Sequence, residues 1–299
     1  MNSRAQIRML ADGRRLHMHD GPIDLVLEAF GDAHEIEAAY RAAATRFVTV
    51  LDELCSELPF LRQPTHADGA LPAGSIARRM VAAVGPYASA TFITPMAAVA
   101  GAVAEEILEA MTTDAELARA YVNDGGDIAL HLSPGQKFVV GMVERPDHPS
   151  LFGTTTIDAS QPVRGIATSG WRGRSLSLGI ADAVTVLSDT AAMADAAATI
   201  IANAVDLPGH PNIKRVPACD LAPDSDLGER LVTQLVGELS PDEIPDALSA
   251  GVRVAESLRV TNLIRAAALN LRGETRVVAG GQGSLSVADS DAERNLVHA

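Results

Sequence analysis

The fold is decided by residues 164–205, whose sequence is RGIATSGWRGRSLSLGIADAVTVLSDTAAMADAAATIIANAV. This stretch predicts a strand, a turn rich in small residues, a second strand and a buried helix. In its first half, Thr168, Ser169 and Gly170 are small enough for backbone N–H groups to approach an anion closely. In its second half, Asp195 and Thr199 lie four residues apart in an Ala-rich helix, so a carboxylate and a hydroxyl share one face. A hard cation such as Mg²⁺ accepts such a pair of oxygen ligands.

The charge and the cysteines of the 299-residue chain argue against several classes of protein. A net charge of −14 argues against nucleic acid or an anionic membrane surface as the main partner. Cys55 and Cys219 are too few for a disulfide scaffold and suit a reducing compartment. The N-terminal residues lack a signal-peptide pattern, and the longest apolar run, residues 95–104, is too short to span a bilayer. We therefore expect a cytoplasmic protein without a membrane or nucleic-acid partner.

The first half of the chain predicts strands followed by helices. Alternating apolar residues on either side of Asp20-Gly21 predict a hairpin of two strands. Residues 32–35 predict a capping box at the start of a long amphipathic helix. Thr94-Pro95 opens a second, Ala-rich helix. Residues 121–143 then predict two strands joined by a turn at 123–127.

The remainder completes an α+β pattern. Strands are expected at 152–157 and 163–168, and the proline-rich residues 207–226 predict a surface crossing or lid. Beyond it, the expected elements are helices at 227–239, from 240 onward and at 254–271, then a strand at 275–279. The pattern contains no linker, so we expect one domain over residues 1–280 and a mobile tail over residues 281–299.

Three short motifs carry a family resemblance. In chain order they are NDGGDI at 123–128, ATSG at 167–170 and ADAAAT at 194–199. Together they resemble the flavin transferases known as ApbE, which carry GGD, ATSG and ADAxxT-like signatures. The chain is still more similar to an uncharacterised, cytoplasmic ApbE-like sister family, through segments at 21–31, 93–108 and 168–187. The sister match covers most of the chain, whereas the match to the transferases covers residues 121–205.

The resemblance implies an ApbE-like α+β fold, with mixed and antiparallel sheets flanked by helices, that binds FAD as substrate or ligand. In the transferases, Mg²⁺ helps to cleave the pyrophosphate of FAD, and FMN passes to a Ser or Thr of an acceptor flavoprotein. Asp195 and Thr199 match the metal ligands, and Asp182 and Asp195 are the implied catalytic residues. The implied flavin-site residues are Asn123, Gly125, Gly126, Asp127, Ala167, Thr168, Ser169 and Gly170.

One departure leaves two functions open. Transferases usually carry a His-Ile-x-Asp-Pro segment after ATSG, whereas here the comparable residues 178–183 are LGIADA, in which only Asp182 corresponds. The first hypothesis is an enzyme that cleaves FAD with Mg²⁺ and transfers FMN to a protein Ser or Thr. The second is a non-transferase of the same fold, a binding protein or an enzyme acting on another small anionic or heteroaromatic ligand. The small-residue helices are compatible with a homodimer.

Each motif also has a purely structural explanation. Asp195 could satisfy a backbone group, and Thr199 could bond back to its own helix. Residues 123–127 could be an ordinary hairpin turn, because Asn, Asp and Gly are the usual turn residues. Arg172 and Arg174 could hold a phosphate or simply solvate a strand edge. Ser169 lacks a nucleophile elbow, which argues against an acyl-transfer hydrolase.

Overall fold

The computed structural model describes residues 4–66, 69, 71–143, 151–280 and 285–287. These residues form two compact units, treated separately below. Unit 1 comprises Met1–Lys137, Asp158–Ala167 and Asp189–Ala196, and unit 2 comprises Phe138–Ile157, Thr168–Ser188 and Ala197–Ala299. The expectation of a single domain over residues 1–280 stays a prediction. Within the described residues, no helix combines the length and the apolar character needed to cross a bilayer.

Unit 1 is built on an antiparallel sheet. Its strands, in spatial order, are β1 (Gln6–Met9), β2 (Leu16–Asp20), β3 (Ile23–Gly31), β4 (Leu117–Asp124), β5 (Asp127–Leu132) and β8 (Gly165–Ser169), the last shared with unit 2. The hairpin predicted at Asp20-Gly21 is confirmed, with Gly21 at φ +59°. Strand β1 was not predicted, because its alternation of polar and apolar residues extends over only four residues, all of them exposed.

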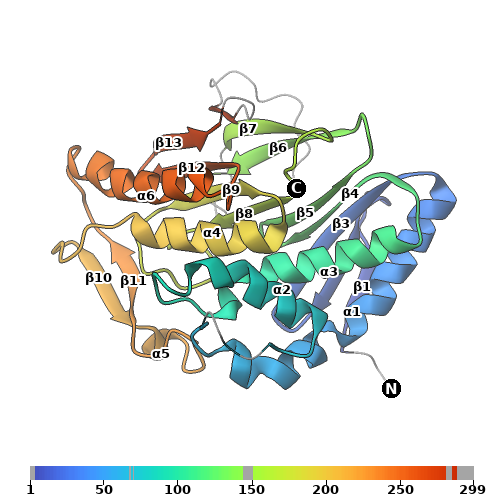
Figure 1. The fold of residues 1–299 in the computed structure, drawn as a ribbon, viewed down its shortest axis with the longest axis horizontal. Helices are drawn as coiled ribbons and strands as arrows, with labels where there is room; N and C mark the ends of the chain where they lie inside the picture. Colours follow the sequence, from blue (N-terminus) through green and yellow to red (C-terminus); the bar gives the residue numbers. More distant parts are fainter. Residues whose placement is uncertain (1–3, 67–68, 70, 144–150, 281–284, 288–299) are drawn as a thin grey trace. The chain divides into compact units, whose positions relative to one another are not determined.

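Two helices cover this sheet. Helix α1 (Ala33–Leu61) packs on β2 and β3, while α3 (Val99–Thr113) packs on β4 and β5 and against α1 (Figure 1). Between them in the chain lie α2 (Ser75–Val84) and the short 3₁₀ helices η1 (Gly85–Tyr87) and η2 (Pro95–Ala98). The predicted capping box of α1 is wrong, although the helix starts as expected. Asp32 makes no side-chain cap, and Oε2 of Glu35 instead accepts the Glu116 N–H at 2.9 Å.

Unit 2 contains strands of three sheets. Strands β9 (Ala183–Ser188), β12 (Ala266–Leu271) and β13 (Glu274–Ala279) are the last three strands of the nine-stranded sheet to which β8 also belongs, and α6 (Glu243–Val260) packs on β12 and β13. Strands β10 (Ile213–Pro217) and β11 (Leu231–Val236) form the second, with the short helix α5 (Ala218–Leu221) beside β10. The third has the order β14 (Leu285–Val287), β7 (Leu151–Asp158), β6 (Lys137–Val143). The rest of the predicted tail lies outside the described residues.

Helix α4 (Ala191–Ala204) is the buried helix predicted within residues 164–205. It begins in unit 1 and ends in unit 2. At its N-terminus, the Thr190 hydroxyl accepts the Met193 N–H at 3.3 Å, the usual arrangement of a helix cap. The α+β class with mostly antiparallel sheets is therefore confirmed, together with the order of elements in the deciding stretch.

Two predicted helices are wrong. Residues 231–236, inside the helix expected at 227–239, form strand β11. Its β-branched residues Val232, Thr233 and Val236 favour a strand, and all three pair with β10. The helix expected at 254–271 ends instead at Val260. There Asn262, at φ +60°, and Leu263 donate their N–H groups to Arg259 and Leu258, a C-terminal cap that stops the helix. The following run of fully buried residues is strand β12.

Candidate functional site

Asp195 belongs to helix α4, and its carboxylate lies at the N-terminus of helix α3. Its Oδ2 accepts the backbone N–H of Gly101 at 3.1 Å, in the first turn of that helix. The first N–H groups of a helix have no partner within the helix and carry a partial positive charge, so they favour an anionic group. The Asp195 carboxylate therefore satisfies a backbone N–H group, which is the purely structural role considered for it in the sequence.

A second hydrogen bond runs in the opposite direction between the same two helices. Oε1 of Glu105 on α3 accepts the N–H of Ala192, in the first turn of α4, at 2.7 Å. The helices approach this closely because residue 101 is glycine. A side chain on Gly101 would overlap the carbonyl oxygen of Ala191. The pair of hydrogen bonds fixes the position of Asp195 within unit 1.

The electrostatic environment of Asp195 is unfavourable to its charge. Burial, followed by the nearby charge of Asp124, raises the pKa of this carboxyl to about 7, against the lowering effect of the Gly101 and Ala100 N–H groups. Asp124 is itself buried, at the end of β4. Sequence reasoning did not select Asp124, although its position directly before Gly125-Gly126 was visible. A proton or a cation on Asp195 relieves this arrangement.

The predicted turn at 123–127 is a two-residue hairpin turn. Asp124 pairs with Asp127 across it, and Gly125 and Gly126 adopt φ +64° and +115°. The side-chain oxygen of Asn123 accepts the Gly126 N–H at 2.8 Å. Hairpin geometry by itself accounts for the Asn and the two glycines.

The ATSG segment ends β8. Ala167 is buried in unit 1, and the hydroxyls of Thr168 and Thr185 lie 2.9 Å apart in unit 2. Gly170 packs so closely on the backbone of Asp182 that a side chain would overlap its carbonyl oxygen. Only glycine fits at this position.

Asp182 is a buried carboxylate with three donors. Its Oδ1 accepts the indole N–H of Trp171 at 3.0 Å and the Nε–H of Arg172 at 2.6 Å. Its Oδ2 accepts the backbone N–H of Arg272 at 2.6 Å. The guanidinium carbon of Arg172 also lies 4.5 Å from the centre of the Trp171 ring. Asp182 thus holds an aromatic and a cationic side chain in a fixed stack.

The structure distributes the predicted site residues over both units. Asp195 lies in unit 1, where its electrostatic neighbour is Asp124. Thr199 lies in unit 2, and its hydroxyl makes no hydrogen bond within the described part of the chain, so it does not bond back to its own helix. The remaining predicted residues are Asn123, Gly125, Gly126, Asp127 and Ala167 in unit 1, and Thr168, Ser169, Gly170 and Asp182 in unit 2.

The donor set suits a cation that takes few protein ligands. Among the described residues, no three or more His, Cys, Asp and Glu side chains are grouped to hold a metal ion. Mg²⁺ commonly uses only one or two carboxylates and completes its coordination with water and substrate phosphate. The carboxylate of Asp195, with its raised pKa, fits such an ion.

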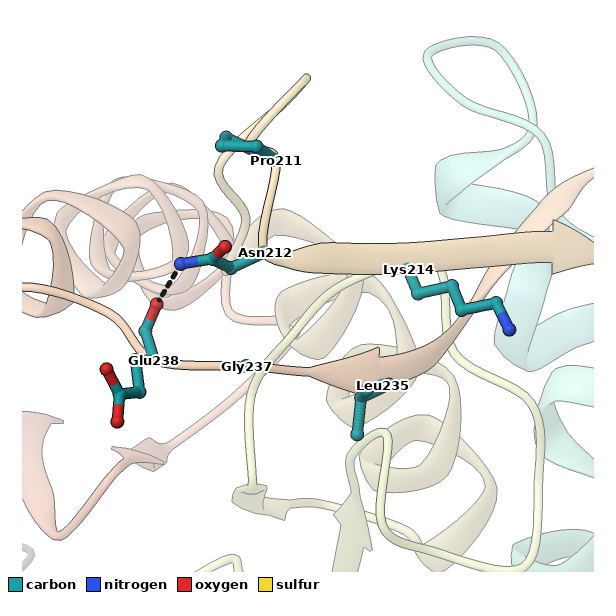
Figure 2. A pocket seen from close by; sticks show the side chains of 6 residues that line it. All are labelled: Pro211, Asn212, Lys214, Leu235, Gly237 and Glu238. Atoms are coloured by element: carbon teal, nitrogen blue, oxygen red, sulfur yellow. Dashed lines mark hydrogen bonds between the residues drawn. The ribbon is translucent and has the colours of Figure 1, made fainter.

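A hollow of about 370 Å³ lies along β10 and β11, and none of the predicted site residues lines it. Its lining residues are Pro211, Asn212, Lys214, Leu235, Gly237 and Glu238. Figure 2 shows the charged ends of Lys214 and Glu238 at opposite ends of the hollow, while the Asn212 amide donates to the Glu238 carbonyl at 2.9 Å. Polar groups do not converge here, so the hollow has the features of a surface groove.

The motifs and the α+β fold define an ApbE-like protein. Residues 7–277 match the family described as AbpE bacteria, and the chain belongs to that family. A UPF0280 protein of Methanococcoides burtonii is 36% identical over 187 residues, covering 61% of this chain and 74% of the relative. A UPF0280 protein of Methanosarcina acetivorans is 33% identical over 186 residues, covering 61% and 70%.

A solved structure is also similar to this chain. A mutant form of the flavin transferase ApbE from Vibrio cholerae is 12% identical, with coverage of 93% of this chain and 97% of that chain and a TM-score of 0.36. The predicted resemblance to the ApbE-like superfamily is confirmed by the family match.

Proposed function

We propose that this protein binds a flavin nucleotide together with a divalent metal ion, and that Asp195 and Thr199 hold the metal. The observation that carries the proposal is the raised pKa of Asp195, to about 7, which burial and the charge of Asp124 cause. A divalent cation would compensate for the charge of Asp195. The unbonded hydroxyl of Thr199, one helical turn away on α4, adds a second oxygen ligand.

The reaction proposed for this site is cleavage of FAD. The bond between the bridging oxygen and the FMN phosphorus of the pyrophosphate breaks, and AMP leaves with the bridging oxygen. The phosphoryl group of FMN passes to the oxygen of a protein Ser or Thr, whose hydroxyl proton is released to solvent. A bound Mg²⁺ supplies neutralisation of the pyrophosphate charge. Asp195 would hold that ion, and the glycines of the turn at 123–127 would permit close approach of the chain to the ligand.

Asp182 remains a predicted catalytic residue, and its contacts favour an indirect role. Three donors already occupy its two oxygens, so it is poorly placed to accept a proton from a substrate. We propose that it acts by positioning Trp171 and Arg172. A non-transferase that binds another anionic or heteroaromatic ligand is the second candidate, because residues 178–183 lack the His and the Pro of the transferase segment.

The test is calorimetric titration of the purified protein with FAD, with and without Mg²⁺, followed by chromatography for FMN and AMP. We expect metal-dependent binding that Asp195→Asn weakens by on the order of tenfold or more. The matched control is Asp114→Asn, which changes an exposed carboxylate at the opposite end of α3. Unchanged metal-dependent binding in Asp195→Asn would refute the metal role. Binding without release of AMP would favour the second candidate.

A further inference from the structure

Trp171 is held rigidly although it is partly exposed. Its indole N–H donates to Asp182 at 3.0 Å, and its backbone N–H donates to the Ala181 carbonyl at 3.0 Å. It is also the single tryptophan of a chain in which only 3% of residues are Phe, Trp or Tyr. A rigid, accessible indole is a favourable stacking partner for a planar ring, because little conformational entropy is lost when it binds.

Arg172 is fixed beside this ring by one nitrogen only. Its Nε–H donates to Asp182, while its terminal nitrogens have no partner within the described part of the chain. The side chain is 23% exposed, so these nitrogens are not sealed in the interior. The free end of a guanidinium presents paired N–H donors in a plane, the geometry that matches phosphate.

Asp182, which accepts hydrogen bonds from both Trp171 and Arg172, is more deeply buried than an arginine at a solvated strand edge would require. Asp182 is 6% exposed, and burying a carboxylate is unfavourable unless charge and hydrogen bonds compensate. Its second oxygen is held by Arg272, a non-glycine residue in the left-handed region at φ +54°. An arginine that only solvates a surface needs neither feature.

The local charge also favours an anion. The protein carries a net charge of −14, so an anionic ligand needs a local concentration of cations. Arg174 is exposed two residues beyond Arg172 and makes no ion pair within the described residues. The charge of Arg172 is paired with Asp182, so among the described residues Arg174 supplies the unpaired positive charge beside the single indole along the chain.

From this geometry we infer that Trp171 and Arg172 form a binding site for a planar heteroaromatic ring that carries a phosphate. The ring stacks on the face of the Trp171 indole that Arg172 does not cover, and the phosphate accepts N–H bonds from the terminal nitrogens of Arg172. Asp182 is the positioning residue of this site. The inference rests on the proposed function, because FMN and AMP, the two halves of FAD, both have this chemistry.

The single tryptophan makes the site directly observable. Metal-free protein is titrated with FMN, AMP, riboflavin, which lacks the phosphate, and ribose 5-phosphate, which lacks the ring. Tryptophan fluorescence is followed in parallel with equilibrium dialysis, and N-acetyltryptophanamide corrects for absorption and collisional quenching. We expect saturable quenching by FMN or AMP, and affinities at least on the order of tenfold weaker for riboflavin and ribose 5-phosphate. A preference for FMN identifies the flavin end of FAD as the occupant, and a preference for AMP identifies the adenine end.

Substitutions test whether the fluorescence change comes from ligand bound at Trp171 and Arg172. Arg172→Gln should weaken FMN or AMP binding on the order of tenfold without changing riboflavin binding. Arg253→Gln, at an exposed arginine of α6, should bind as the wild type does. Asp182→Asn should shift the tryptophan emission and weaken phosphate-dependent binding. Wild-type affinity for FMN and AMP in Arg172→Gln would overturn the inference even if Asp182→Asn failed to fold.

The two proposals fail in distinguishable ways. The Trp171 site is overturned if FAD binds in a metal-dependent way without changing tryptophan fluorescence, and if Arg172→Gln binds FAD as the wild type does. That result leaves the metal role of Asp195 in place. Saturable, phosphate-dependent quenching by FMN or AMP, combined with unaltered metal-dependent FAD binding in Asp195→Asn, supports the Trp171 site and overturns the metal role.

Discussion

The backbone nitrogen of Gly101 lies 3.1 Å from Oδ2 of Asp195, so the first turn of α3 binds the carboxylate of α4. The two residues are far apart in the sequence, and each would be ordinary in isolation. Their contact places a raised-pKa carboxyl group at a helix N-terminus, beside the buried Asp124. The stability and the metal affinity of the protein should both depend on this contact and on the residues that support it.

The Asp195 carboxyl should make the metal-free protein less stable as pH rises, the opposite of what an ion-paired aspartate does. Its pKa is about 7 when folded, against an ordinary aspartate value near 4 when unfolded. Between these values the folded state binds more protons than the unfolded state, so this group lowers stability as pH rises through that window. Asp195→Asn should therefore gain stability relative to the wild type between about pH 5 and about pH 8. Urea unfolding at both pH values measures this, and Asp114→Asn should show no such trend.

A metal ion and a proton should compete for the carboxylate of Asp195. An Asp195 carboxyl must lose its proton before it can bind a cation, so Mg²⁺ should bind more tightly at about pH 8 than at about pH 6. Calorimetry in two buffers of different ionisation enthalpy would reveal proton release at the lower pH. Equal affinity at both pH values would contradict a metal role for this carboxylate.

Gly101→Ala should destabilise the protein although alanine is the better helix former. The new methyl group would overlap the Ala191 carbonyl and force α3 and α4 apart, at a cost on the order of 1–3 kcal/mol. Gly85→Ala is the matched control, because a side chain there meets no atom within 4 Å and the backbone is helical. Chemical denaturation compares the two, and equal stability would argue against tight packing at Gly101.

Glu105→Gln should destabilise the protein by about 1–2 kcal/mol. Glutamine can still accept the Ala192 N–H, but it loses the ion pair that Glu105 makes with Arg79 at 3.2 Å, where Glu105 is 13% exposed. The control is Glu37→Gln, whose exposed pair with Arg41 should contribute less than about 0.5 kcal/mol. Urea unfolding compares the two variants, and a comparable loss in both would show that burial does not strengthen the Glu105 pair.

Local patterns predicted most of the fold. The Asp20-Gly21 turn and the Ala-rich segment around Asp195 carry their own signals, since turn chemistry and helix propensity are local properties. Strand β12, by contrast, is an Ala-rich run that favours a helix by propensity. It is a strand because β9 and β13 pair with it on either side, and no local pattern contains that pairing.

The candidate site shows the same division. The ADAAAT motif pointed to Asp195, and ATSG pointed to the turn that leads to Trp171. Neither motif indicates Glu105, because its partner Ala192 is distant in the chain. Asp124 was overlooked for a related reason. Its importance comes from its charge acting on Asp195, which only the folded chain brings near.

Because the Gly101 amide is hydrogen-bonded to Asp195, its hydrogen–deuterium exchange rate reports on the state of that carboxyl group. An amide proton that is bound to a carboxylate exchanges with deuterium slowly, and its exchange rate changes when the carboxylate gains a proton or moves toward a ligand. Following that single amide would therefore record the state of Asp195 without any label on the ligand and without any substitution in the chain.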